Sequence, residues 1–280
     1  MIFTNNLFND YISSCTRDFI ETSKLQVYDV QDYAMHISGI MSSDYYMKEI
    51  FNSTLELGNV KTVALPAYES SEALRIWHKI NKARRCIRHF SATEQLNLHE
   101  LSSLLQNTLF ISRVDAHGND VKHRNIPSPG GLYPIDLYYL NLKAIDGLEV
   151  GAYYYDLHQG SLKKVSDETI DAAFREKVFD AFSVTEGVPT DIDFFNASGV
   201  VILGGTLNRT AFKYLDRGIK WVFTEAGSLM NNIQLVATAQ GGVGTCPCAG
   251  FIDDAIAEII NFRSIDQVPI ISIVVGKPVK

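Results

Sequence analysis

A short basic run is the first feature of this sequence that suggests chemistry. Five of the nine residues from Lys82 to Phe90 can carry positive charge, although the formal net charge of the chain is −7. Arginines three and four positions apart can converge on one phosphate, and a guanidinium group matches the geometry of that anion. A solvated basic face would give the same pattern. The run therefore predicts either an anion-binding site or an exposed charged surface.

A glycine-rich stretch is the second such feature. The segment from Gly241 to Phe251 holds four glycines, one proline and two cysteines. Glycines this dense allow the backbone to approach a flat or charged group closely. Two interpretations stay open: a tight connection between two helices, or a backbone wall against a planar cofactor. Gly241 and Gly242 are expected to end the preceding helix, since glycine adopts the left-handed conformation of many helix ends.

Two further motifs lie between these segments. A rigid turn with an exposed backbone is expected from Pro127 to Pro134, where two glycines are flanked by three prolines. Farther along, Phe212-Lys213-Tyr214 precedes a polar break at Asp216-Arg217-Gly218. Taken alone, Lys213 is interpreted as a surface lysine and Tyr214 as a core aromatic residue.

Composition limits the class of protein. With 280 residues, 46% of them apolar and 20% charged, the chain suits one large or two small globular domains. The net charge of −7 argues against nucleic acid as the main partner. We see no apolar run of membrane-spanning length and no signal peptide, and four cysteines make no disulfide framework, so we expect a cytoplasmic protein.

Several common chemistries lack their motifs. The sequence contains no His-Glu-x-x-His, no Walker phosphate loop and no Gly-x-Ser-x-Gly elbow. Cys246-Pro247-Cys248 has no second cysteine pair nearby, and the seven histidines are scattered, so we predict no metal site.

Periodicity predicts helices and strands that alternate irregularly. A long helix is expected before Gly241, because Val222, Ala226, Leu229, Ile233 and Val236 share one helix face. Other helices are expected at 10–19, 42–57, 70–80, 98–110, 167–182 and 253–262, and strands at 135–142, 150–156, 162–165, 199–205 and 269–276. Asn97 with Glu100 forms a capping-box pattern. Strands that are bunched and interleaved with helices predict the α+β class.

Taken together, the motifs resemble the FMN-dependent nitroreductase superfamily and, within it, the SagB/McbC-type azoline dehydrogenases of peptide-antibiotic biosynthesis. The matching segments are Arg84–Phe90, Ser128–Pro134, Phe212–Tyr214 with Arg217-Gly218 and Glu225–Ser228, and Gly244–Phe251. The resemblance spans residues 80–280. It implies a nitroreductase-like fold, with a central, mostly antiparallel sheet flanked by helices, in an intertwined homodimer. We therefore expect an accessory helical segment at 1–66 and an FMN-binding domain at 67–280.

The resemblance also implies where FMN binds. The phosphate is expected on Arg84, Arg85 and Arg88, with Cys86 where the family usually has serine, a stronger hydrogen-bond donor than a thiol. The remaining expected FMN contacts are Ser128, Gly130, Gly131, Leu132, Ala249, Gly250 and Lys277. Backbone N–H groups of Ala249 and Gly250 would lie near the flavin N5 atom. Lys277 would help to hold the phosphate, unless it is a solvated lysine near the chain end.

The implied reaction oxidises peptide thiazolines or oxazolines to thiazoles or oxazoles. Flavin N5 would take a hydride, Lys213 would take the Cα proton, Tyr214 would orient the ring, and O2 would reoxidise the flavin. Lys213 would need burial beside Tyr214 to become neutral. A precursor peptide and a cyclodehydratase are the expected partners. Two alternatives remain: an NAD(P)H-dependent nitro or quinone reductase, although Ala249 replaces a glutamate frequent in nitroreductases, and a flavin-free structural subunit of a biosynthetic complex.

Overall fold

A six-stranded antiparallel sheet forms the centre of the protein in the computed structural model, which describes residues 11–53, 58–67, 70–115, 121–165, 171–184 and 190–279. The strand order is β5-β4-β3-β6-β8-β7, and each neighbouring pair is antiparallel. The strands are β3 (Ile135–Asn141), β4 (Gly151–Asp156), β5 (Ser161–Lys164), β6 (Gly199–Thr206), β7 (Gly244–Cys248) and β8 (Gln267–Gly276). The predicted α+β fold with an antiparallel sheet is confirmed.

The middle strands are apolar because both of their faces are covered. In β6, Val201 and Leu203 belong to one hydrophobic core, and Val200 and Ile202 belong to the other. This alternation is the period of two that a strand imposes on its side chains. The continuous apolar run of β6 is therefore explained by helices on both sides of the sheet.

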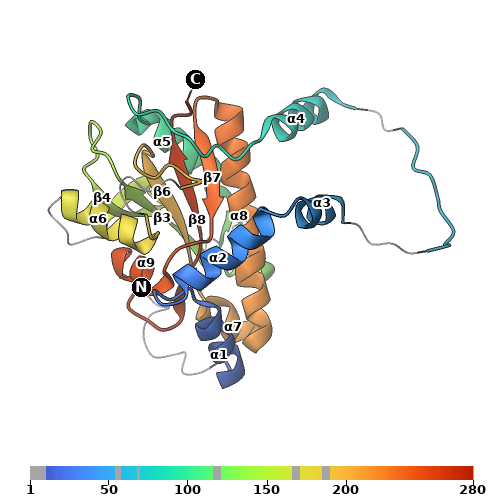
Figure 1. Cartoon of the computed structure of the whole chain (residues 1–280), viewed down its shortest axis with the longest axis horizontal. Helices are drawn as coiled ribbons and strands as arrows, with labels where there is room; N and C mark the ends of the chain where they lie inside the picture. Colours follow the sequence, from blue (N-terminus) through green and yellow to red (C-terminus); the bar gives the residue numbers. More distant parts are fainter. Residues whose placement is uncertain are drawn as a thin grey trace.

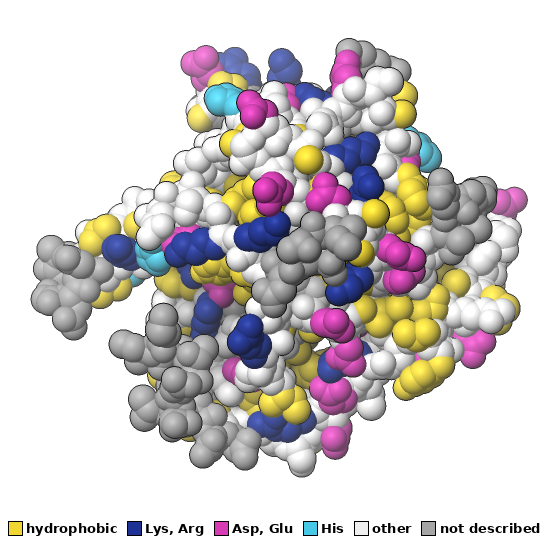
Figure 2. Space-filling view, turned by 90° about the vertical axis from the view of Figure 1, so that its left-hand side faces the viewer, with side chains coloured by type: hydrophobic (Ala, Val, Ile, Leu, Met, Phe, Trp, Pro, Cys, Tyr) yellow, Lys and Arg dark blue, Asp and Glu magenta, His cyan; other side chains and the backbone are white. Residues whose placement is uncertain are grey.

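Helices cover the two faces of the sheet in separate groups (Figure 1). One face packs against α5 (Leu98–Thr108), α7 (Asn208–Tyr214) and α8 (Gly218–Gln240). The other packs against α6 (Asp171–Ala181) and α9 (Asp253–Ile259). On the face that carries α6 and α9, acidic and basic side chains are interspersed with apolar ones (Figure 2). None of the helices in the described ranges has the length and apolarity needed to cross a membrane.

The long helix and its boundary agree with the sequence prediction. Val222, Ala226, Leu229 and Ile233 are buried along α8, which ends at Gln240. Gly241 follows with φ +73°, a conformation that favours glycine. Helix α5 begins at the predicted capping box, in which Asn97 accepts from Glu100 N and Glu100 accepts from Asn97 N.

The N-terminal part contains more helix than the sequence predicted. Helices α1 (Ser14–Ser23), α2 (Val30–Met41), α3 (Asp44–Asn52) and α4 (Glu72–Ala83) precede the sheet. Helix α2 was not predicted, and α1 and α3 start where serines 13 and 43 accept the first backbone hydrogen bonds. Figure 1 shows α3 and α4 projecting to one side of the sheet layers. Residues 54–57 and 166–170, the ends of two predicted helices, lie outside the described residues.

Two irregular segments contain strands. Of the two interpretations left open for the glycine-rich stretch after α8, the helix-to-helix connection is excluded, because Gly244–Cys248 forms the edge strand β7, paired with β8. For the polar segment from Arg113 to Arg124 the sequence predicts a loop, and this prediction is wrong, because β1 (Ile111–Asp115) and β2 (Val121–Arg124) pair there as a β-hairpin. Most side chains of this hairpin are exposed on both faces, so the sequence lacks the alternation by which a strand is recognised.

Candidate active site

Lys213 and Tyr214 meet the glycine turn at Gly130. A methyl group placed on Gly130 would lie 2.7 Å from Tyr214 Oη and 3.0 Å from Lys213 Nζ, and the φ of Gly130 is +70°. Lys213 Nζ also lies 5.4 Å from the centre of the Tyr214 ring. Only a residue without a side chain fits this contact and this backbone conformation. The fold thus brings an amine, a phenol and an exposed turn together from segments far apart in the sequence.

The position of this pair is fixed by the junction of α7 and α8. Lys213 and Tyr214 are the last residues of α7, and Leu215 follows with φ +51°. Gly218 then packs so closely on α7 that an added methyl group would lie 2.8 Å from the carbonyl carbon of Thr210. The Tyr214 ring also contacts Trp221 of α8 edge-on, with 6.5 Å between ring centres. These contacts restrict where both side chains can point.

The burial that a base role of Lys213 would need is not supplied by the described residues of the single chain. Its side chain is exposed, whereas Tyr214 is half-buried. The reason is its place on the outer side of the last turn of α7, just before the exposed residues Leu215 to Arg217. A lysine accepts a proton only as a neutral amine, which desolvation favours. Any covering of Lys213 must therefore come from a group outside the described residues.

The turn itself, Ser128 to Tyr133, is held from inside. Gly131 N donates to Ser128 O at 2.9 Å, and Tyr133 N donates to Ser128 Oγ at 2.9 Å. Leu132 is half-buried. At Gly131, with φ +65°, an added methyl group would meet no protein atom within 4 Å. One side of the turn therefore presents bare backbone to open space.

A buried ionic cluster, absent from our sequence predictions, supports the turn. Asp136 accepts from Arg209 at 2.6 Å and from Arg124 at 3.5 Å. Arg209 Nη1 also donates to Tyr133 O at 3.1 Å, and Arg124 N donates to Tyr133 Oη at 3.0 Å. An aspartate inside a buried strand needs such partners. In the sequence, Asp136 stands between the apolar residues Ile135 and Leu137, which indicates a buried carboxylate that needs a positively charged partner.

A cavity of about 400 Å³ opens between the β1–β2 hairpin and the turn. It is lined on one side by Ser128, Gly130 and Gly131 and on the other by basic residues that include Arg113, Lys122 and His123. Asp115 pairs with both Arg113 and His123, at 3.3 and 2.7 Å. The cavity lies next to Lys213 and Tyr214, because Gly130 contacts both.

The arginine segment forms a second group. Residues 84–90 run beside β7, where Ile87 N donates to Thr245 O at 2.9 Å. Arg84 Nη1 donates to Gln234 Oε1 of α8 at 3.0 Å and lies 3.8 Å from Cys86 Sγ. Gln234 was not singled out in the sequence. Arg84 and Cys86 are therefore brought together on the C-terminal half of α8.

The other two arginines are placed differently. Arg85 Nη1 donates to the carbonyl oxygens of Lys82 and Arg84, at 2.7 and 2.8 Å, so its guanidinium turns back on its own backbone. The Arg88 side chain is exposed, while its carbonyl oxygen accepts from Asp193 N at 2.9 Å. Among the described residues, Arg84 is therefore the arginine of the three that hydrogen-bonds to α8 and approaches Cys86.

The three remaining predicted residues lie near the ends of β7 and β8. Lys277 is not a solvated lysine: its ammonium group pairs with Glu100, and its side chain is 18% exposed. Ala249 and Gly250 follow β7 and are exposed, and a methyl group on Gly250 would meet no protein atom within 4 Å. Ala249 also borders a cavity of about 470 Å³ whose other wall includes Lys24 and Leu25 of the N-terminal segment.

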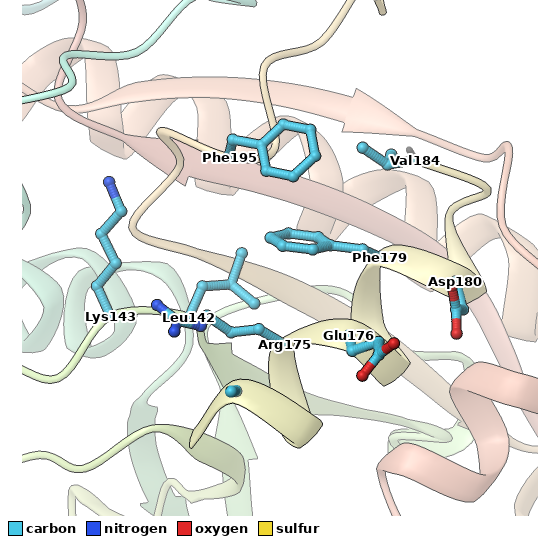
Figure 3. Close-up of a pocket in the computed structure, with 9 residues that line it drawn as sticks. Leu142, Lys143, Arg175, Glu176, Phe179, Asp180, Val184 and Phe195 are labelled. Atoms are coloured by element: carbon cyan, nitrogen blue, oxygen red, sulfur yellow. The ribbon is translucent and has the colours of Figure 1, made fainter. Parts of the chain in front are cut away.

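A larger pocket, of about 530 Å³, lies at the opposite end of β3 (Figure 3). The rings of Phe179 and Phe195 pack against each other on its wall, with 4.7 Å between ring centres, and Lys143 and Arg175 also line it. None of the predicted site residues lines this pocket. Among the described residues, no cluster of three or more His, Cys, Asp or Glu side chains could hold a metal ion.

Comparison with known proteins assigns the family. The family model described as "Nitroreductase family" matches residues 82–277, which include both groups of site residues. This chain belongs to the nitroreductase family. A protein of Methanocaldococcus jannaschii that is named for this family is 27% identical over 228 residues, covering 80% of this chain and 100% of the relative.

Three solved structures share the fold of this nitroreductase-family chain. A chain of the E. coli microcin synthetase McbBCD complex with truncated pro-MccB17 bound is 20% identical, with a TM-score of 0.59, over 92% of this chain and 100% of that one. A nitroreductase from Anabaena variabilis has 18% identity and a TM-score of 0.56, over 95% of this chain and 46% of that one. A nitroreductase from Ralstonia eutropha has 18% identity and a TM-score of 0.55, over 80% and 88% of the two chains.

Proposed function

We propose that this chain is an FMN-dependent dehydrogenase that oxidises peptide thiazolines or oxazolines to the aromatic azoles. The observation that carries the proposal is the contact of Lys213 Nζ and Tyr214 Oη with Gly130 at the edge of an open turn. A reductase that only passes electrons needs no amine at this point, whereas removal of a ring Cα proton needs a base. The fold shared with a chain of the microcin synthetase complex is consistent with such a substrate.

The residues present suit FMN. Gly131 and Gly250 offer backbone without side chains or neighbouring protein atoms, which a flat ring needs. Arg84, with Cys86 and Arg88, would hold the phosphate, since a guanidinium group binds it through charge-assisted hydrogen bonds. Gln234 and Glu225 lie nine residues apart on α8, or about 14 Å along its axis, so that helix would support both the phosphate end and the ring end. Bound FMN would supply a hydride acceptor.

The side chains of this chain would supply the proton chemistry. In the oxidation, the ring loses a proton from Cα and a hydride from Cβ, and a Cα–Cβ double bond forms. Lys213 Nζ would accept the proton once the peptide covers it and favours the neutral amine. Tyr214 Oη, next to Nζ on Gly130, would orient the ring by a hydrogen bond. The cavity of about 400 Å³ beside the turn is the proposed entrance for the heterocycle.

We also propose an intertwined homodimer that works with a cyclodehydratase on a precursor peptide. Residues 1–66 would be an accessory segment, since Leu25 N donates to Asp253 Oδ2 at 2.9 Å and Ser13 N donates to Asp216 Oδ1 at 2.7 Å. The second contact lies two residues after Tyr214. The N-terminal segment is thus tied to the loop that ends the Lys213–Tyr214 helix.

The alternative is an NAD(P)H-dependent nitro or quinone reductase on the same fold. The name of the Methanocaldococcus jannaschii relative and the exposure of Lys213 favour it. Such an enzyme would tolerate loss of the amine at residue 213.

The test is product formation by matched variants. An azoline-containing peptide is incubated in air with the protein and with Lys213→Arg, which keeps the charge but cannot act as a base. Mass spectrometry should show the loss of two hydrogen atoms per ring with the parent protein only. FMN content, measured by absorbance, should be equal in both proteins. Equal azole formation by Lys213→Arg would refute the role of Lys213.

A further inference from the structure

Glu225 is a buried carboxyl group that the proposed reaction does not use. It lies in α8 with 1% of its surface exposed. Ile135 N donates to its Oε1 atom at 3.4 Å, and its Oε2 atom has no hydrogen-bond partner among the described residues. A carboxyl group buried with a free oxygen is unfavourable unless it is protonated or serves a purpose.

The charges around Glu225 are arranged unevenly. The positive charge of Arg124 in β2 favours the ionised form of Glu225, while the negative charge of Asp136 in β3 opposes it. Arg124 and Arg209 both form ion pairs with Asp136, so neither guanidinium group serves Glu225 alone as a counter-ion. Burial is the largest effect and raises the pKa of Glu225 to about 7. Glu225 can therefore gain or lose its charge when the pH changes around neutrality.

Glu225 is linked to the candidate active site through Ser128. The Ser128 side chain interacts with the Glu225 carboxyl and favours its ionised form. Ser128 Oγ already accepts from Tyr133 N at 2.9 Å, which leaves its hydroxyl proton free to be donated elsewhere. Two residues later, Gly130 contacts Lys213 and Tyr214. A short chain of contacts thus leads from the carboxyl group to the amine and the phenol.

We propose that Glu225 is a positioning residue for the turn from Ser128 to Gly131. While its carboxyl group is neutral, the turn lies against Lys213 and Tyr214. When the carboxyl group ionises, it draws the turn toward α8. The inference rests on the function proposed above for this site. An ionised carboxylate needs more donors than a neutral one, and the hydroxyl of Ser128 is the donor at hand. A stronger pull on Ser128 would loosen the contact at Gly130. The position of the turn relative to Lys213 and Tyr214 would then depend on whether Glu225 carries its proton.

Trp221 provides a reporter that does not depend on activity. It lies one helical turn before Glu225 on α8, and its ring contacts that of Tyr214. The chain has two tryptophans, and the other, Trp77, is 53% exposed. The experiment follows the fluorescence of Trp77→Phe protein, as purified, across the pH range around neutrality. We expect an emission change with a midpoint at about pH 7.

Two variants decide the outcome. Glu225→Gln, made in the same Trp77→Phe background, has the shape of the neutral acid and should lose the transition. Ser128→Ala removes a contact that favours the ionised form, so it should move the midpoint to higher pH. A transition that persists in Glu225→Gln would overturn the proposal. If circular dichroism shows that Glu225→Gln does not fold, an unchanged midpoint in Ser128→Ala would overturn it instead. No azoline peptide is used, so a wrong assignment of the reaction would leave this result intact.

Discussion

Replacing Gly130 by alanine tests the contact on which the proposed site is built. The added methyl group would lie 2.7 Å from Tyr214 Oη and 3.0 Å from Lys213 Nζ, so one or both groups must move. An L-residue at φ +70° also costs about 1–2 kcal/mol. Overpacking adds roughly 1–3 kcal/mol. We therefore expect Gly130→Ala to lower the free energy of unfolding by about 2–5 kcal/mol.

Gly131→Ala is the matched control for backbone strain. Its φ is +65°, but its methyl group would meet no protein atom within 4 Å. We expect a loss of only about 1–2 kcal/mol from the left-handed conformation. Denaturant unfolding of both variants, followed by circular dichroism, gives the difference directly. Equal destabilisation of the two variants would refute the contact with Lys213 and Tyr214.

A double-mutant cycle measures how much of this destabilisation comes from the clash with the Tyr214 hydroxyl group. In Tyr214→Phe protein the atom at 2.7 Å is gone, so Gly130→Ala should cost less there than in the parent by about 1 kcal/mol or more. Displacement of reacting groups by about 1 Å can lower a rate about a hundredfold. We expect Gly130→Ala to slow azoline oxidation, measured per bound FMN, to that extent. If the losses of unfolding free energy in Gly130→Ala and Tyr214→Phe simply add in the double mutant, this would argue against the contact of residue 130 with Tyr214 Oη.

Three other predictions concern pH, cofactor and stability. The pKa of Glu225 rises from 4.5 to about 7 on folding, so its contribution to stability is present below about pH 4.5 and is lost as pH rises to about 7. The free energy of unfolding should fall by up to about 3 kcal/mol over that range, and Glu225→Gln should remove this component in denaturant titrations. Arg84→Ala should weaken FMN binding by about ten- to a hundredfold in fluorescence titrations, and an unchanged Kd would argue against its role at the phosphate. Asn97→Ala removes the capping box with Glu100 and should lower Tm by about 2–4 °C without loss of FMN, while an unchanged Tm would contradict a stabilising cap.

The regular parts of the fold could be predicted from the sequence because their burial has a clear period. The apolar face of α8 and the continuous apolar run of β6 follow directly from their places in the core. β7 could not be recognised, because glycine and proline hide a strand whose register is set by β8, as in the pairing of Pro247 with Ile273. Ser91 accepts from Glu94 N as a cap would, yet no helix begins between Ser91 and Leu98. Local signals therefore failed where tertiary pairing decided the structure.

The candidate site was only partly predictable for a similar reason. Glycines at 130 and 131 are visible in the sequence, but their contact with Lys213 and Tyr214 depends on the packing of α7 against the turn. The exposure of Lys213 depends on where α7 ends. The pairing of Asp136 with Arg209 joins residues on different elements, and no local pattern specifies it. Sequence motifs identified the residues, and the fold decided which of them meet.

The most direct test of the proposed function is whether an azoline-containing peptide reduces the flavin in the absence of oxygen. FMN-loaded protein is mixed anaerobically with an azoline-containing peptide and, separately, with NADPH, while flavin absorbance is recorded. We predict that the peptide bleaches the flavin and that Lys213→Ala, still yellow, abolishes this bleaching. Bleaching by NADPH alone, with the same rate in Lys213→Ala, would contradict the dehydrogenase and support a nitro or quinone reductase.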